Sequence, residues 1–256
     1  MENVRIERRE TAAIVTIDRP EARNALNRQT LMELRDAMRE LAADDEILSI
    51  VLTGAGEKAF VAGADVVSLG DRTMLQTLAN ENQVVLSEIA EIQKPTIAAI
   101  NGFALGGGCE LALACDIRIA SENARLGFPE LGLGFMPGAG GTQRLAKVVG
   151  TSQAKELIFT GDILRAEAAL KIGLVSKVVP LAELLPAAME ICGKIAKKAP
   201  WAVRMAKVVI GKSTDVDLQT GLLIERLGQA VLFGTEDRME GVTSFIEKRD
   251  PHYKGR

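Results

Sequence analysis

The sequence predicts an α/β fold followed by a helical C-terminal region, on three observations. In the first half of the chain, short apolar runs alternate with segments whose apolar residues recur at helical spacing. From residue 142 onward, helical segments dominate. The length of 256 residues and the hydrophobic share of 47% allow one large domain, or a core domain with a smaller unit, around a sizeable core.

The expected strands are short and mostly apolar. They cover residues 4–7, 13–17, 47–53, 96–101, 116–120 and 174–179. The segment Asp18-Arg19-Pro20 ends the first pair, and Gly54-Ala55-Gly56 closes the third strand. Because strands and helices alternate, we expect a largely parallel sheet.

The expected helices have apolar residues three or four positions apart. Asn27 can cap the first of them. A long helix over 74–92 should turn five apolar residues inward: Leu75, Leu78, Val85, Leu86 and Ile89. The others cover 109–114, 142–149, 152–159, 166–172, 184–198, 201–210, 217–233 and 237–247. The last helices have no sheet of their own, so they must pack on the core domain or on another subunit.

Composition excludes several classes of function. The formal net charge is -3 and basic residues alternate with acidic ones, so nucleic acid is not an expected partner. The only histidine, His252, lies close to the C-terminus, which argues against a Ser-His-Asp arrangement. No His/Cys cluster has metal-ligand spacing, and we expect no metal.

The sequence also indicates a compartment. The charged segment Met1–Glu7 does not resemble a signal peptide, and the least polar stretch, 96–109, is short and interrupted by glycines. We therefore expect no membrane partner. The three cysteines (Cys109, Cys115 and Cys192) have no CxxC spacing, which fits a reducing compartment. We expect a cytoplasmic protein.

A first glycine-rich segment, 101–110, leads from a buried strand into a helix and ends at Glu110. Glycine lets the backbone approach a ligand closely, and the start of a helix favours an anion. A triple glycine alone is more often a tight packing turn. The carboxylate of Glu110 inside an otherwise apolar helix favours a functional role, although it could be a structural charge at a helix N-terminus.

A second segment, 126–144, contains Glu130 alone among apolar and glycine residues. Taken singly, Glu130 could be a loop residue that makes local hydrogen bonds. Two isolated carboxylates, each beside a glycine-rich turn, suggest a general acid/base pair with Glu110. Sequence spacing alone does not show that they meet.

These segments resemble the enoyl-CoA hydratase/isomerase (crotonase) family. The similar motifs are Ile97–Gly102, Gly107–Glu110, Pro129-Glu130, Pro137–Thr142, Phe60–Asp65 and Phe245–Arg249. With Arg19-Pro20, Asn24–Leu26, Thr160-Gly161 and Gly173–Val175, the similarity extends from about residue 5 to about residue 250. The chain most resembles the short-chain enoyl-CoA hydratases of this family.

The resemblance implies a spiral of ββα units over residues 1–195 and a helical C-terminal region over 196–256 that mediates trimer formation. Such trimers commonly pair into hexamers. It also implies a hydro-lyase of fatty acid metabolism, such as β-oxidation, that adds water to a trans-2-enoyl-CoA. Coenzyme A would belong to the substrate, and no prosthetic group is expected.

Residue roles follow from the same resemblance. The N–H groups of Ala64 and Gly107 would form an oxyanion hole for the thioester carbonyl. Glu110 would be the base that activates water, and Glu130 the acid that protonates the α-carbon. Contacts to coenzyme A would come from two sets of residues: the backbone at Ala62, Ala64, Asp65 and Val66, and the cations Arg23 and Lys248. Lys248 could come from another subunit. Either cation could instead be an ordinary solvated charge. Residues 66–84 would shape the acyl pocket.

Other functions stay open. Relatives catalyse isomerisation, thioester hydrolysis, decarboxylation or condensation, usually with one or both carboxylate positions changed, so the nearest alternative is an isomerase or a specialised hydratase. Some relatives bind RNA through a lysine-rich helix. Here the matching helix mixes Arg28, Arg35 and Arg39 with acidic residues, which predicts weak attraction for phosphates. A scaffolding role would leave the two glutamates unexplained.

Overall fold

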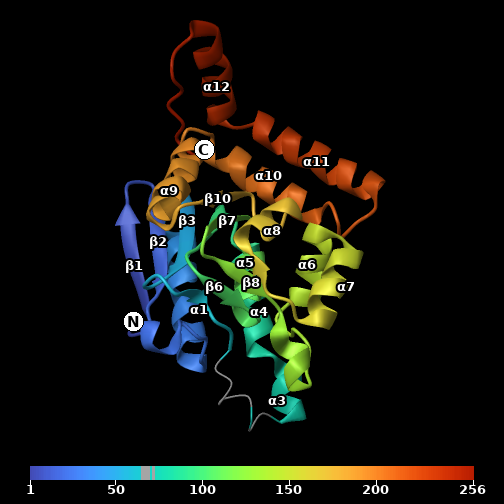
Figure 1. Cartoon of the computed structure of the whole chain (residues 1–256). Coiled ribbons are helices and arrows are strands. Elements are labelled where there is room, and N and C mark those ends of the chain that lie inside the picture. Colours follow the sequence, from blue (N-terminus) through green and yellow to red (C-terminus); the bar gives the residue numbers. More distant parts are fainter. Residues whose placement is uncertain (65–69, 71–72) are drawn as a thin grey trace.

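The computed structural model describes residues 1–64, 70 and 73–256. Its larger sheet has the strand order β1-β2-β3-β5-β7-β10. These strands are β1 (Val4–Arg9), β2 (Ala12–Ile17), β3 (Ser49–Gly54), β5 (Thr96–Ile100), β7 (Ile117–Ser121) and β10 (Lys177–Val179). Only β1 and β2 pair antiparallel in this sheet as described, and the other neighbours run parallel. The α/β prediction is confirmed (Figure 1).

A second, four-stranded sheet was not expected from the sequence. Its order is β4 (Ala59–Val61), β6 (Phe103–Leu105), β8 (Arg125–Gly127) and β9 (Leu164–Arg165). Three times the chain leaves a strand of the large sheet and enters this one, from β3 to β4, from β5 to β6 and from β7 to β8. This repeated path is the expected spiral. The strands have at most three residues, too few for an alternating pattern to be visible.

Helices cover both faces of the large sheet. Alternate residues of β2 point to opposite sides: Val15 packs in the cluster with α1 (Arg28–Ala43), and Ile14 packs with α9 (Leu184–Ala196). A strand buried on both faces is apolar at nearly every position. This explains why β2, β3 and β5 appear in the sequence as continuous apolar runs.

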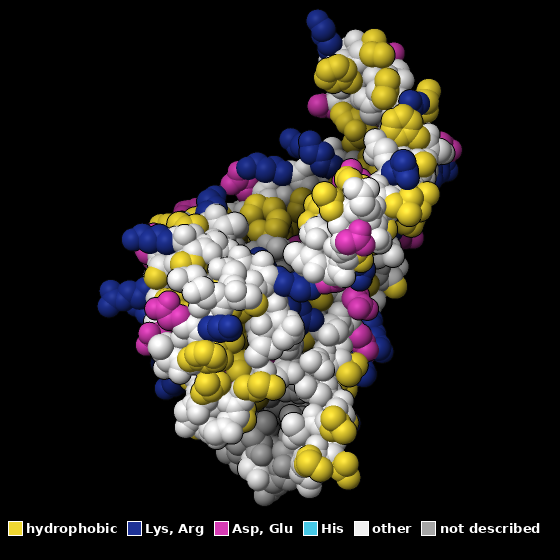
Figure 2. Space-filling view, turned by 90° about the vertical axis from the view of Figure 1, so that its right-hand side faces the viewer, with side chains coloured by type: hydrophobic (Ala, Val, Ile, Leu, Met, Phe, Trp, Pro, Cys, Tyr) yellow, Lys and Arg dark blue, Asp and Glu magenta, His cyan; other side chains and the backbone are white. Residues whose placement is uncertain are grey.

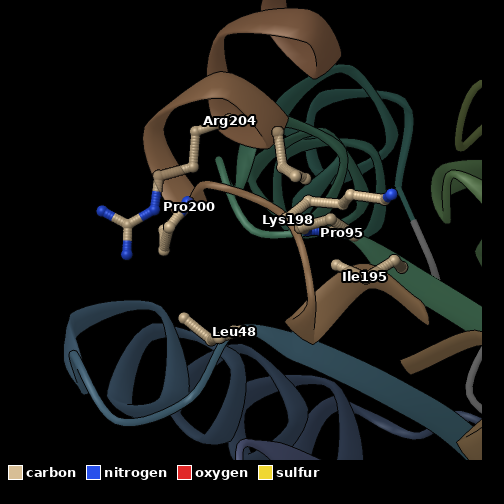
Figure 3. Close-up of a pocket in the computed structure, with 7 residues that line it drawn as sticks. Leu48, Pro95, Ile195, Lys198, Pro200 and Arg204 are labelled. Carbon is tan, nitrogen blue, oxygen red and sulfur yellow. The ribbon is translucent and has the colours of Figure 1, made fainter. Parts of the chain in front are cut away.

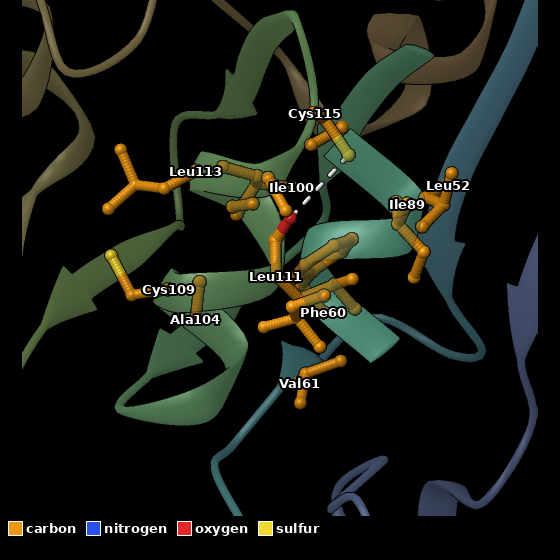
Figure 4. Packing of buried hydrophobic residues seen from close by; sticks show 14 of the residues in the cluster. Leu52, Phe60, Val61, Ile89, Ile100, Ala104, Cys109, Leu111, Leu113 and Cys115 are labelled. Carbon is orange, nitrogen blue, oxygen red and sulfur yellow. Dashed lines mark hydrogen bonds between the residues drawn. The ribbon is translucent and has the colours of Figure 1, made fainter. Parts of the chain in front are cut away.

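Helix α5 (Gly107–Ala114) lies in the interior, and all its residues from Gly108 onward are buried. Figure 4 shows Leu111 of α5 close to Phe60 of β4, and the Cys115 Sγ beside the Leu111 carbonyl oxygen, at 3.6 Å. A helix buried on all sides has no polar stripe. Glu110 therefore has its carboxylate inside the protein.

The prediction of one helix over 74–92 is wrong. Two helices, α3 (Met74–Ala79) and α4 (Glu81–Glu91), meet at Asn80, whose φ of 38° is left-handed. Asparagine tolerates this conformation, and its side chain caps α4 by accepting the Gln83 N–H. The break turns α3 away from the core, so the expected inward residues Leu75 and Leu78 are 72% and 81% exposed. Val85, Leu86 and Ile89 are buried as predicted.

The second half of the chain is mainly helical, as predicted. After η2 (Pro129–Leu133) its helices are α6 (Gly141–Val149), α7 (Thr151–Thr160), α8 (Ala166–Lys171), α9, α10 (Pro200–Lys212), α11 (Leu218–Phe233) and α12 (Glu236–Glu247). The strand expected at 174–179 is shorter, because residues 174–176 form a bend after the turn at 172–173. Helices α11 and α12 lie farther from the sheets than α10 does (Figure 1).

Helix α10 is attached to the large sheet by Lys207. Its Nζ donates to the Lys94 carbonyl oxygen at 3.0 Å and pairs with Asp116 at 2.8 Å. Asp116 in turn accepts the Thr96 N–H at 2.7 Å. The division at residues 195 and 196 stays a prediction. No helix in the described part of the chain is long and apolar enough to cross a membrane.

Candidate active site

Two buried asparagines hold the turn that precedes β4. The Asn101 Nδ2 donates to the carbonyl oxygens of Gly54 and Gly56, at 2.9 and 2.7 Å. The Asn24 Nδ2 donates to that of Ala59 at 2.7 Å. Buried amides that are fully hydrogen-bonded specify one local geometry. They therefore fix where β4 begins and where the chain emerges after it.

The segment after β4 lies beside residues 23–26. The Ala62 N–H donates to the Arg23 carbonyl oxygen at 3.1 Å, and the Leu26 N–H donates to that of Gly63 at 2.9 Å. Leu26 and Ala64 also form a parallel bridge. The structure thus brings three predicted site residues together: Arg23, Ala62 and Ala64. The predicted contacts Asp65 and Val66 lie outside the described residues.

The first turn of α5 packs directly against this segment. A Cβ on Gly108 would overlap the Val61 carbonyl oxygen, and a Cβ on Gly107 would lie 3.5 Å from the Ala64 nitrogen. Only glycine permits the close approach at position 108, whereas a Cβ at position 107 would make an ordinary van der Waals contact. Gly107 is the first residue of α5, so its N–H has no acceptor within the helix. The glycine turn at the start of α5 thus places the backbones of Ala64 and Gly107 side by side.

Glu110 is 3% exposed and follows Gly107 by one turn. Its Oε1 accepts the N–H groups of Ala139 and Gly141, at 2.7 and 2.8 Å. Burial raises the pKa of Glu110, while these two donors and the positive charge of Arg144 act to lower it. Glu110 is therefore more than a charge at a helix N-terminus, because the turn at 139–141 is built around it.

Glu130 lies in η2 and is 7% exposed. A Cβ on Gly106 would lie 2.8 Å from its Oε1. Its Oε2 is buried without a hydrogen-bond partner among the described residues, so local hydrogen bonds do not satisfy the whole carboxyl group. Burial raises the pKa of Glu130 to about 7, with a smaller rise from the charge of Glu110, against the lowering effect of its own N–H.

The carboxyl group of Glu130 lies against Gly106, four residues before Glu110. The two carboxyl groups are in different environments. Glu110 accepts two N–H groups and has an arginine nearby, which favours the ionised form. Glu130 has an oxygen without a partner and retains its proton up to about pH 7. A pair whose environments separate their pKa values can supply a base and an acid at once.

Lys248 does not join this group within one chain. It directly follows α12, is exposed, and lies far from α5 (Figure 1). The N–H donors of Ala139 and Gly141, and Arg144, were not predicted as site residues. The run Gly138-Ala139-Gly140-Gly141 was visible in the sequence, but nothing in it indicated that its N–H groups face Glu110.

Two other hollows are not lined by the glutamates. The first, shown in Figure 3, lies among Leu48, Pro95, Ile195 and Pro200, and its volume of about 10 Å³ is too small for a substrate. The second, of about 450 Å³, lies between α10, α11 and α12. Within the described ranges no group of His, Cys, Asp and Glu could hold a metal ion.

Known proteins resemble this chain in sequence and in overall fold. The sequence pattern of the enoyl-CoA hydratase/isomerase family matches residues 7–256. The chain belongs to this family. A short-chain-enoyl-CoA hydratase from Clostridium acetobutylicum is 48% identical over 97% of this chain and 96% of its own. A crotonyl-CoA hydratase from Syntrophomonas wolfei is 44% identical over 98% of both chains.

The fold agrees with this membership. A crystal structure of an enoyl-CoA hydratase from Bacillus anthracis superposes with a TM-score of 0.96 at 42% identity, over 99% of this chain and 100% of that one. The enoyl-CoA hydratase/isomerase fold therefore extends over the whole chain, including the helices after residue 196.

The raised pKa of Glu130 predicts a cost in stability. A buried carboxyl with a folded-state pKa near 7 destabilises the fold as the pH rises from its unfolded value of 4.5 through 7. Glu130→Gln should therefore raise the free energy of unfolding at about pH 8 by about 1–3 kcal/mol, allowing for partial solvation. Most of this gain should disappear by about pH 5.

Urea unfolding at both pH values and a fixed protein concentration measures the effect. Glu122→Gln, at an exposed carboxyl a few residues away, is the control and should change little at either pH. Equal stability of wild type and Glu130→Gln at both pH values would contradict the assigned environment.

Proposed function

We propose that the protein is an enoyl-CoA hydratase, a hydro-lyase that reversibly adds water to a trans-2-enoyl-CoA and gives a 3-hydroxyacyl-CoA. The observation that carries the proposal is the pair of buried glutamates in unlike environments beside the Ala64–Gly107 approach. Both relatives described above bear hydratase names. The presence of both carboxylates favours hydration over isomerisation, for which family members usually change one or both of them.

Glu110 acts as the base in hydration. A water between the two carboxyls gives a proton to Glu110 as its oxygen attacks the β-carbon. The N–H groups of Ala139 and Gly141 hold Oε1 in place and stabilise its charge before the reaction. Glu130, protonated at the start, gives its proton to the α-carbon. Dehydration uses the same groups with their roles exchanged.

The backbone at Ala64 and Gly107 stabilises the intermediate. Attack on the β-carbon moves negative charge onto the thioester oxygen as an enolate. Two N–H donors and the positive end of α5 favour this charge. Side-chain donors of this kind contribute roughly 10²–10³ in rate when one is removed. Backbone donors supply the same effect, because Gly108 lets the two chain segments meet.

The substrate is a coenzyme A thioester, and no prosthetic group takes part. The backbone at Ala62 and Ala64, with Arg23 beside it, is suited to the pantetheine and nucleotide parts. Asp65, Val66 and Lys248 complete the proposed contacts. The activity belongs to fatty acid metabolism such as β-oxidation, in the cytoplasm.

An apolar surface next to the glutamates suits the acyl chain. Its exposed side chains come from α3 and from the segment after Glu130: Met74, Leu75, Leu78, Leu131, Leu133, Phe135 and Met136. The Asn80 Nδ2 joins the two segments by donating to the Gly138 carbonyl oxygen at 2.7 Å. The wrong prediction about α3 is informative here, because helix residues that leave the core are available to a substrate.

The helical region, 196–256, assembles trimers, which can pair into hexamers. Its exposed large apolar residues include Trp201, Val208, Ile210, Leu218, Leu222, Leu223, Leu227, Val231, Phe233, Met239, Val242, Phe245 and Ile246. Figure 2 shows hydrophobic side chains gathered over this end of the molecule. So large an apolar surface is typical of an interface. Lys248 would then reach the site of a neighbouring subunit.

The catalytic assignment predicts that Glu110→Gln and Glu130→Gln each lower the turnover of crotonyl-CoA by roughly 10²–10⁴-fold. The glutamine keeps the size of the side chain but cannot exchange the proton. Hydration is followed as the loss of the conjugated enoyl thioester absorbance, with coenzyme A binding measured in parallel. Glu122→Gln is the control, and near-normal turnover of either site variant would reject the assignment.

The assembly predicts a mass of three or six chains by light scattering. Leu227→Asp places a charge on the apolar face of α11, since Leu227 is 58% exposed while its neighbour Gly228 packs on Met205. It should shift the protein toward smaller species. Gln219→Asp adds the same charge at an exposed polar position and should not. A monomeric wild-type protein would contradict the proposal.

A further inference from the structure

The turn that holds Glu110 is itself held by an arginine that the proposed chemistry does not use. Ala139 and Gly141, which donate to Glu110, flank Gly140, whose φ is 105°. The Arg144 Nη1 donates to the Ala139 carbonyl oxygen at 2.9 Å. A Cβ on Gly140 would overlap this Nη1, so the guanidinium lies directly against the turn.

Arg144 also contacts α4. The Arg144 Nη2 donates to the Ser87 Oγ at 3.3 Å, and the Asn80 Nδ2 holds the Gly138 carbonyl oxygen from the start of that helix. The turn is therefore fixed from both sides, by α6 and by α4. Two hydrogen bonds from one planar guanidinium to two different segments define its orientation.

Partial burial of the Arg144 guanidinium has a desolvation cost, which a residue with only a packing role would not need to bear. Its side chain is half-buried, and burial lowers the pKa of its guanidinium. Within the described residues no carboxylate lies within ion-pair distance of it. The carboxylates whose charges favour its ionised form are Glu110 and, less strongly, Glu91 of α4. A partly buried cation that lacks an ion-pair partner but interacts with a buried carboxylate is a candidate for a functional role.

We propose that Arg144 is a positioning residue for the base: it fixes the turn whose N–H groups hold Glu110 and keeps that carboxylate ionised. The inference rests on the proposed role of Glu110 in hydration. It adds a reason why Glu110 rather than Glu130 is the base, although burial raises the pKa of both carboxyls.

Several groups face Glu110 and bear on its ionisation. Arg144 approaches from α6, Glu130 from η2, and the thiol of Cys109 from α5 itself. Burial raises the pKa of Cys109 well above its usual range, so this thiol stays neutral. Arg144 is the one cation in this described group, and its removal should make Glu110 harder to ionise.

The test is the pH profile of crotonyl-CoA hydration for Arg144→Gln, Arg144→Lys and Lys147→Gln. In Arg144→Gln, the acid limb of the kcat profile should move to higher pH by roughly one unit. The loss in kcat should therefore be greatest at the acid end of the profile, with KM within about twofold of wild type. Arg144→Lys keeps the charge but loses the planar fork, so kcat should fall while the acid limb stays near the wild-type position.

Lys147→Gln is the matched control. It removes a cation from the same helix, but one that pairs with Asp215 at the surface, and its profile should match that of wild type. An equal loss for Arg144→Gln at every pH would show a structural role only and overturn the proposal. If Arg144→Gln does not fold, Arg144→Lys decides: unchanged kcat in that variant also overturns it.

Glu110→Gln, assayed in the same experiment, distinguishes a failure of the proposed hydratase mechanism from a failure of the role of Arg144. If Glu110→Gln abolishes turnover while Arg144→Gln keeps the wild-type profile, the hydratase stands and the role of Arg144 is rejected. If Glu110→Gln retains turnover, the assignment of the base fails first.

Discussion

The contact between the first turn of α5 and the end of β4 is the constraint on which the site depends. With a side chain at position 108 the helix could not lie against Val61, and Gly107 could not lie beside Ala64. The same contact directs Glu110, one turn later, toward the 139–141 turn. Gly106, just before it, leaves room for the carboxyl of Glu130. One close backbone approach therefore organises a candidate oxyanion site and both carboxyl groups.

Burial raises the pKa of both glutamates, and the structure opposes this more strongly at Glu110 than at Glu130. Two N–H groups and the charge of Arg144 act on Glu110. Glu130 lacks a comparable set among the described residues, and the charge of Glu110 disfavours its ionisation further. Burying two acidic groups lowers the free energy of unfolding. This loss accompanies the placement of a base and an acid in one site. This asymmetry is what the proposed reaction requires.

The sequence predicted the parts of this account that depend on long patterns. Apolar runs predicted the large sheet, helical spacing predicted the C-terminal helices, and the family motifs brought out Glu110, Glu130, Ala64 and Gly107. The small sheet escaped because its strands have at most three residues. The exposure of α3 escaped because it depends on one left-handed residue, Asn80.

The environment of Glu110 could not be predicted from the sequence for another reason. Its N–H donors come from Ala139 and Gly141, 29 and 31 positions later in the chain, and are backbone groups without a sequence signature. Arg144 appears in the sequence as one more cation on an amphipathic helix. Only the fold shows that its guanidinium lies against Gly140. Long-range backbone geometry of this kind is invisible to spacing.

The most direct test of the account is to observe the proton on Glu130. Infrared difference spectra of wild type against Glu130→Gln, recorded from about pH 5 to about pH 9, report the C=O stretch of a protonated carboxyl. We expect this band at the acid end and its loss near pH 7, the pKa assigned to Glu130. A band already absent at pH 5.5, about one unit above the ordinary glutamate pKa, would contradict the division of roles between the two glutamates.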